Sequence, residues 1–214
     1  MGGPHPGAPT RVLVVCAVPQ ELASLPAREH VDVVATGVGP VEAALETARA
    51  LARIPYDAVI NAGIGGGFRD RCTVGDVVVC SREDYAELGL EDGSAFPLPD
   101  GIELVRSVEA DTGLLRPFLE GHIPVIVGRG VTSAIVTSTT ARALVLAHRF
   151  RADVESMEGF SVLRAARDAD VPAIEIRGIS NLVGERASNE WNFRAGADAA
   201  VATTQALLDV LLPG

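Results

Sequence analysis

The stretch Val154-Glu155-Ser156-Met157-Glu158-Gly159-Phe160 joins an extended segment to a helical one and carries two carboxylates. The residues that follow, 161–170, place their apolar side chains with helical periodicity. Glu158 therefore falls at a predicted strand-to-helix junction, where a side chain can face a cleft at the carboxyl edge of a sheet. The position equally suits an acid that only interacts with the positive end of a helix dipole. This stretch alone leaves both interpretations open.

Strands and helices alternate on both sides of this junction. Continuous apolar runs predict buried strands at 12–18, 31–36, 57–61, 77–80, 123–127 and 172–176. Helices are predicted at 41–51, from a Thr139 cap to residue 150, and at 193–212, with weaker helical character at 102–119. Pro19 is well placed to open a helix that contains Glu21. The alternation predicts an α/β fold.

Length and composition exclude several classes of protein. A chain of 214 residues with 48% hydrophobic residues fits one domain, which we expect over 11–214, after a disordered Gly- and Pro-rich tail at 1–10. A formal charge of −10 disfavours binding to nucleic acid and to anionic membranes. No apolar run is long enough to cross a bilayer. Three cysteines without CxxC spacing indicate neither disulfides nor a zinc site, and we expect a reducing, cytoplasmic location.

The most glycine-dense stretch is 62–68, directly after a predicted strand. We interpret residues 63–67 as a loop in which glycine lets a ligand approach the backbone. The stretch is neither a Walker loop nor a GxGxxG motif followed by a helix, so no nucleotide phosphate or dinucleotide cofactor is indicated.

Three predicted strand ends carry polar residues: Glu21, Met157 with Glu158, and Ser180 with Asn181. In a twisted α/β sheet such ends can converge on one pocket. Together with the glycines they form, in order, a strand followed by Glu, then N-x-G-x-x-G-G, V-E-x-M-E-G and R-x-I-S-[DN]. This set resembles the nucleoside phosphorylase and nucleosidase superfamily over roughly residues 11–212, and the joint match is more specific than any single motif.

The resemblance implies a single-domain three-layer αβα sandwich around a twisted mixed β-sheet, a small-molecule nucleoside substrate, no cofactor and no metal. It also implies a homodimer or higher homo-oligomer, in which the long polar segment at 82–101 could complete a neighbouring active site. Glu158 would accept hydrogen bonds from the ribose hydroxyls, and Glu21 would activate water. Asn181 would hydrogen-bond the leaving base, with Ser180 in support. The remaining predicted contacts are Met157 against the ribose, the Gly65 and Gly66 backbone, and Phe160, which stacks on the purine or packs in the core.

Two departures from relatives narrow the expected reaction. The adenine-specific nucleosidases have Asp where this chain has Asn181, and a carboxamide can donate to N7 or O6 of a 6-oxopurine. The phosphorylases bind phosphate with arginines, whereas 61–68 contains none, so water is favoured as the nucleophile. The hydrolases among these relatives that act on a 6-oxopurine nucleoside are the futalosine hydrolases, and residues 177–184 resemble theirs. This resemblance implies release of hypoxanthine from futalosine in a menaquinone route.

Three alternatives stay open: an adenine-type nucleosidase acting on methylthioadenosine or adenosylhomocysteine, a phosphate-dependent purine nucleoside phosphorylase, and a non-catalytic nucleoside-binding protein. The sequence does not say which residue would bind the carboxylated aromatic end of futalosine. Arg69, Arg129 and Arg186 are candidates, because a carboxylate needs a cation or backbone amides.

Overall fold

The computed structural model describes residues 11–90, 94, 97–184 and 191–213. The predicted tail at 1–10 and the candidate Arg186 lie outside these residues. The strands are β1 (Val12–Cys16), β2 (Val31–Ala35), β3 (Ala58–Gly67), β4 (Val77–Tyr85), β5 (Ser107–Glu109), β6 (Ile126–Thr132), β7 (Val154–Ser156) and β8 (Ala173–Leu182). The helices are η1 (Pro19–Leu22), α1 (Pro40–Arg53), α2 (Thr112–Leu119), α3 (Thr140–Phe150), α4 (Gly159–Asp168) and α5 (Phe193–Leu211).

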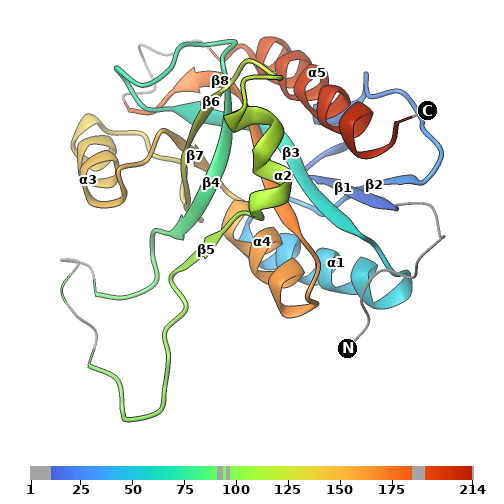
Figure 1. The fold of residues 1–214 in the computed structure, drawn as a ribbon. Coiled ribbons are helices and arrows are strands. Elements are labelled where there is room, and N and C mark those ends of the chain that lie inside the picture. Colours follow the sequence, from blue (N-terminus) through green and yellow to red (C-terminus); the bar gives the residue numbers. More distant parts are fainter. Residues whose placement is uncertain (1–10, 91–93, 95–96, 185–190, 214) are drawn as a thin grey trace.

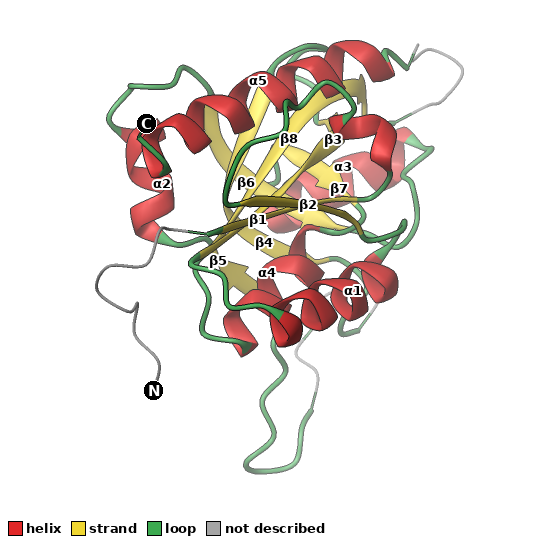
Figure 2. Ribbon diagram, turned by 90° about the vertical axis from the view of Figure 1, so that its right-hand side faces the viewer, coloured by secondary structure: helices red, strands yellow, loops and turns green. Residues whose placement is uncertain are grey.

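The described strands form one mixed sheet, which confirms the predicted α/β class. β3 pairs with β1 and β8 in parallel and with the short β7 in antiparallel orientation, while β4 pairs with β6, β5 and β8. Since β6 also pairs with β7, the strands β3, β8, β4, β6 and β7 close into a ring. Helix α5 lies against one side of the sheet and α1 and α4 against the other, so the layers are those expected (Figures 1 and 2).

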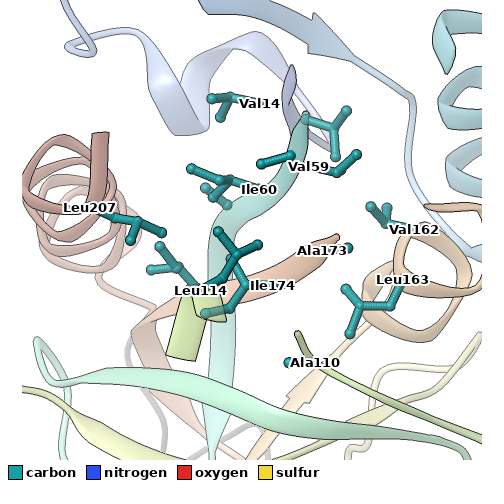
Figure 3. Close-up of a cluster of buried hydrophobic side chains, with 14 of the residues drawn as sticks. Val14, Val59, Ile60, Ala110, Leu114, Val162, Leu163, Ala173, Ile174 and Leu207 are labelled. Carbon is teal, nitrogen blue, oxygen red and sulfur yellow. The ribbon is translucent and has the colours of Figure 1, made fainter. Parts of the chain in front are cut away.

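The core fills the space between the sheet and these helices (Figure 3). Val14, Val59 and Ile60 from β1 and β3 are fully buried, as are Ile174 of β8 and Leu207 of α5. Because β1 and β3 are covered on both faces, they are apolar at nearly every position. The continuous run at 12–18 therefore predicted its strand correctly.

The glycine-rich stretch is a strand and not the predicted loop. Residues 63–67 continue β3 and pair with β8 along their whole length. Side chains of neighbouring elements lie directly on this part of the strand: a Cβ at Gly63 would lie 2.5 Å from Glu21 Oε1, and one at Gly66 would lie 2.9 Å from the Val183 side chain. Glycine is needed here to make room for those side chains. Because the side chains come from distant parts of the chain, the glycine stretch by itself does not predict a strand.

Other boundaries also differ from the predictions. β4 continues to Tyr85 and β8 to Leu182, because polar residues in both strands find partners inside the closed ring. The segment 102–119 is helical only in α2, and β5 precedes it. The helix predicted after Pro19 is only the 3₁₀ turn η1. The cap at Thr139 is confirmed, since its side chain accepts from Arg142 N (3.3 Å).

The three cysteines, Cys16, Cys72 and Cys80, are free and buried, as expected for small apolar side chains. Burial raises the pKa of Cys16 to about 12, so its thiol stays neutral near pH 7. Among the described residues, no helix is both long enough and apolar enough to cross a membrane.

Candidate active site

A pocket of about 240 Å³ opens where β1, β3, β7 and β8 end. This is the carboxyl edge of the parallel strands, as predicted from the polar strand ends. Seven of the eight predicted site residues line it: Glu21, Gly65, Gly66, Met157, Glu158, Ser180 and Asn181. The ring of strands therefore brings together residues that are up to 160 positions apart in the chain, from Glu21 to Asn181.

Glu21 is held by backbone amides. It is 3% exposed, and its Oε2 accepts hydrogen bonds from Ala17 N (2.9 Å) and Val18 N (3.1 Å). Oε1 accepts from Ile64 N of β3 at 2.9 Å. Three N–H donors fix the orientation of the carboxylate. Oε2 uses both of its lone pairs on the Ala17 and Val18 amides, whereas Oε1 keeps one lone pair with which it can accept a proton or a hydrogen bond.

Glu158 is also buried and fixed at both oxygens. Its Oε1 accepts from Gly39 N (3.0 Å), and its Oε2 forms an ion pair with Arg177 Nη2 (3.3 Å). Burial raises the pKa of Glu158, while Arg177 and the Gly39 amide oppose that shift and Glu21 adds to it. The carboxylate thus faces the pocket with its geometry set before any ligand arrives.

Arg177 is the cation behind the site, and the sequence analysis gave it no role. It is 1% exposed, its Nε donates to Glu175 Oε1 (2.6 Å), and its Nη1 donates to Ile64 O (3.2 Å). Coulombic attraction to Glu175, Glu158 and Glu21 raises its pKa against the opposing effect of burial. It serves the buried acids rather than a ligand, because it does not line the pocket.

A β-bulge explains how consecutive residues of β8 reach the same pocket. In regular pairing, neighbouring side chains point to opposite faces. Here Gly65 pairs with Ile179 and Gly66 with Asn181, so Ser180 is the extra residue and both polar side chains line the pocket. Ser180 Oγ donates to Asn181 Oδ1 (2.8 Å), and Asn181 Nδ2 donates to Leu182 O (3.3 Å). The second N–H of Nδ2 is left for a ligand.

Apolar residues that the sequence analysis did not single out line the rest of the pocket. Ile135 and Val136, 59% and 39% exposed, form part of the wall in the loop between β6 and α3. Glu155, to which we gave no role, holds this loop, since its carboxylate accepts hydrogen bonds from Thr137 N (3.1 Å) and Thr137 Oγ1. Val18, Val38, Phe193 and Trp191 also belong to the apolar lining. These residues lie in loops and at helix starts, where no periodicity marks them.

Phe160 does not line the pocket. It is 8% exposed and its ring stacks on Tyr85, with centroids 5.3 Å apart. The structure therefore places it in the core, which was the second interpretation of this aromatic. Of the candidate cations for a carboxylate, neither Arg69 nor Arg129 lines the pocket, and Arg129 contributes to a separate cavity.

The charges of the pocket are all of one sign in the described part of the chain. Glu21, Glu155 and Glu158 line it, and none of the described lining residues is Lys or Arg. Apolar walls, two fixed carboxylates and one oriented carboxamide suit a neutral molecule that has a flat ring and hydroxyl groups. Fold and pocket together define a class of protein: an α/β protein whose pocket, at the carboxyl edge of its sheet, suits a neutral nucleoside-like molecule.

Comparisons with known proteins agree with this class and refine it. Residues 22–213 match the family described as the Phosphorylase superfamily. A futalosine hydrolase of Streptomyces coelicolor is 38% identical over 82% of this chain and 76% of that protein. A second futalosine hydrolase, from Thermus thermophilus, is 31% identical over 81% of this chain and 79% of that protein. The chain belongs to the phosphorylase superfamily and, within it, to the family of the futalosine hydrolases.

Solved structures confirm the fold. The 5'-methylthioadenosine/S-adenosylhomocysteine nucleosidase of Helicobacter pylori superposes with a TM-score of 0.81 at 17% identity, covering 94% of this chain and 99% of that one. At this identity the likeness concerns the fold and leaves the substrate open.

Proposed function

We propose that the protein hydrolyses the N-glycosidic bond of futalosine, releasing hypoxanthine and dehypoxanthine futalosine, in the futalosine route of menaquinone biosynthesis. The names of the relatives that match most of the chain support this substrate. The observation that carries the hydrolytic reaction is the charge of the pocket, where three glutamates and no described Lys or Arg side chain are found.

A phosphate nucleophile would be repelled by this pocket. Phosphate binding in proteins relies on arginine forks, lysine or clusters of backbone N–H groups. Arg177, the buried cation described above, is already engaged by Glu158 and Glu175 and by the Ile64 carbonyl. Water carries no charge and needs only a base. Glu21 supplies one, and we assign it the deprotonation of water, a general-base effect worth on the order of 100- to 10,000-fold.

Glu158 would act on the sugar. Cleavage of the N-glycosidic bond leaves positive charge on the ribose, and a buried anion below the ring stabilises that charge. The same carboxylate would accept hydrogen bonds from the ribose 2′- and 3′-hydroxyls. Gly39 N and Arg177 hold the group from the protein side, so its remaining lone pairs are directed to the ligand. Met157, which precedes it, would pack on the ribose.

Asn181 would act on the departing base. Its Oδ1 is occupied by the Ser180 hydroxyl, which orients the amide with Nδ2 as the free donor. A neutral donor is compatible with the N7 or the O6 acceptor of hypoxanthine, and it stabilises negative charge on the leaving purine. Val136 and Ile135 offer an apolar wall, and the Gly65 and Gly66 backbone lies beside the pocket.

A substrate panel tests the proposal. The protein is incubated with futalosine, methylthioadenosine and inosine, each with and without phosphate, and the released base is identified by chromatography. We expect hypoxanthine from futalosine at equal rates with and without phosphate. Adenine release from methylthioadenosine as the fastest reaction, or dependence on phosphate, would support one of the two enzymatic alternatives instead. No release from any substrate would support a nucleoside-binding protein.

The assembly and location stay predictions. We propose a homodimer or higher homo-oligomer, supported by the described residues 97–106 ahead of β5, which extend from the body of the molecule (Figure 1). Size-exclusion chromatography with light scattering measures this directly, and a monomer at assay concentrations would contradict it. The free cysteines support the cytoplasmic location, and the single sheet supports one domain over 11–214.

A further inference from the structure

Two fully buried glutamates lie behind the site and have no part in the proposed reaction. Glu83 of β4 and Glu175 of β8 are both 0% exposed. Within the part of the chain that the structure describes, Glu83 Oε1 and Glu175 Oε2 have no hydrogen-bond partner, and carboxylate oxygens of the two residues lie within 4.8 Å of one another. Two ionised carboxylates at this separation in the protein interior would repel each other strongly. Something positive must lie between them.

The surroundings leave room for little more than a proton. A Cβ at Gly130 would collide with the Glu83 carboxylate, and one at Gly159 would collide with the Glu175 carboxylate, so backbone packs directly on both groups. Burial, followed by the charge of Glu175, raises the pKa of Glu83 well above that of an ordinary glutamic acid. Burial acts to raise the pKa of Glu175 as well, but the charge of Arg177 opposes it, and the pKa of Glu175 is lowered overall. The proton therefore belongs to Glu83.

This pair is connected to the ribose carboxylate by short polar contacts. Thr132 Oγ1 donates to Glu83 Oε2 (2.7 Å) and accepts from Phe160 N (2.6 Å). Phe160 lies in the first turn of α4, the helix that begins directly after Glu158. On the other side, Asn61 Nδ2 donates to Glu175 Oε1 (3.1 Å), which also binds Arg177 Nε. Arg177 then reaches Glu158.

We propose that Glu83 is a positioning residue: as a neutral acid it donates a hydrogen bond to Glu175, and so keeps Arg177 directed at Glu158. Without that donor, the bare Oε2 of Glu175 competes for the Arg177 guanidinium and draws it from Glu158. This inference rests on the proposed function, since Glu158 is the predicted ribose ligand.

A metal ion is the competing occupant. Cys80 Sγ and one carboxylate oxygen from each of Glu83 and Glu175 all lie within 4.8 Å of one another. A thiolate and two carboxylates can together bind a divalent cation. Burial, followed by the charges of Glu175 and Glu83, raises the pKa of Cys80 well above that of an ordinary thiol, which favours the neutral thiol. The positive Arg177 beside Glu175 also disfavours a second cation. Metal content of the purified protein is therefore part of the test.

The first experiment does not depend on the substrate. A neutral carboxylic acid has a carbonyl band in the infrared that a carboxylate lacks. We expect this band in the difference spectrum between the wild type and E83Q at neutral pH, with less than one equivalent of bound metal by mass spectrometry. Absence of the band, or a stoichiometric metal ion, would overturn the proposal even if the substrate assignment is correct. If futalosine is not the substrate, the band is still expected.

The second experiment uses activity. In E83Q the amide can donate to Glu175 and accept from Thr132, so kcat/KM should stay within about threefold of the wild type, as in the exposed control E120Q. In E83L no donor remains, and kcat/KM should fall on the order of 10- to 100-fold, the range set by leaving a buried polar group unpaired.

E83L should also move the acidic limb of the kcat/KM profile to higher pH. Glu158 faces Arg177, Glu21, Glu175 and the Gly39 amide, and loss of Arg177 removes its main stabilising charge. A merely structural role would lower the melting temperature without moving this limb. Equal losses in E83Q and E83L, or an unmoved limb in a folded E83L, would overturn the positioning role.

Discussion

Replacing Glu158 by Gln changes one charge at the centre of the proposed site and keeps its shape. Glu158 Oε1 faces the donor Gly39 N, and Oε2 faces the donor Arg177 Nη2. The amide of Gln would have to turn its NH₂ toward one of these donors. Hydrogen bonds to a charged group contribute roughly 1.5–3 kcal/mol each, and two ribose hydroxyls are involved, so E158Q should lower kcat/KM by about 100- to 10,000-fold.

The assay is the initial rate of hypoxanthine release from futalosine by chromatography, with circular dichroism to confirm folding. Glu155→Gln is a matched control, because Glu155 also lines the pocket but its carboxylate is bound by Thr137. We expect E155Q to stay within about tenfold of the wild type, the cost of weakening one wall contact. The reasoning is refuted if E158Q retains wild-type kcat/KM, or if E155Q loses as much as E158Q.

Four further outcomes follow from the same geometry. Glu21→Gln should abolish turnover while calorimetry still detects hypoxanthine binding; unchanged turnover would remove Glu21 from the mechanism. Asn181→Asp should lower kcat/KM for futalosine relative to an adenine-bearing analogue, and an unchanged ratio would contradict the role of the carboxamide. Burial raises the pKa of Glu158, and the reaction requires its ionised form. As the pH is lowered, kcat/KM should therefore begin to fall at a pH above the pKa of an exposed glutamate. A pH-rate profile in which the fall occurs at the ordinary glutamate pKa would speak against this. Gly39→Ala should cost about 1 kcal/mol of unfolding free energy, measured by urea denaturation, since Gly39 has φ 95°, and a stabilised variant would be inconsistent with the strain.

The sequence predicted the parts of the fold that depend on local patterns. β1 follows from its apolar run and α3 from the Thr139 cap, and α5 lies in the segment predicted as helical at 193–212. The ring of strands could not be predicted in the same way, because it depends on pairing between distant segments. Only in the ring does the glycine stretch at 63–67 become a strand, since the side chains that cover it come from η1, β7 and β8.

The candidate site was predictable where function requires a particular residue type at a strand end. Glu21, Glu158 and Asn181 are such residues, and the structure brings them to one pocket. Arg177 and Glu175 were missed because a charge inside a strand looks solvent-exposed until its partners are known. The wall formed by Ile135 and Val136 was missed because its loop is held in place by a hydrogen bond between Thr137 and Glu155, and no sequence motif predicts that bond.

The most direct test of the central claim is the identity of the sugar product when the protein acts on futalosine in saturating phosphate. Mass spectrometry should find free dehypoxanthine futalosine together with hypoxanthine in equal amounts, at the rate observed without phosphate. A phosphorylated sugar product, or no hypoxanthine from futalosine, would contradict the account.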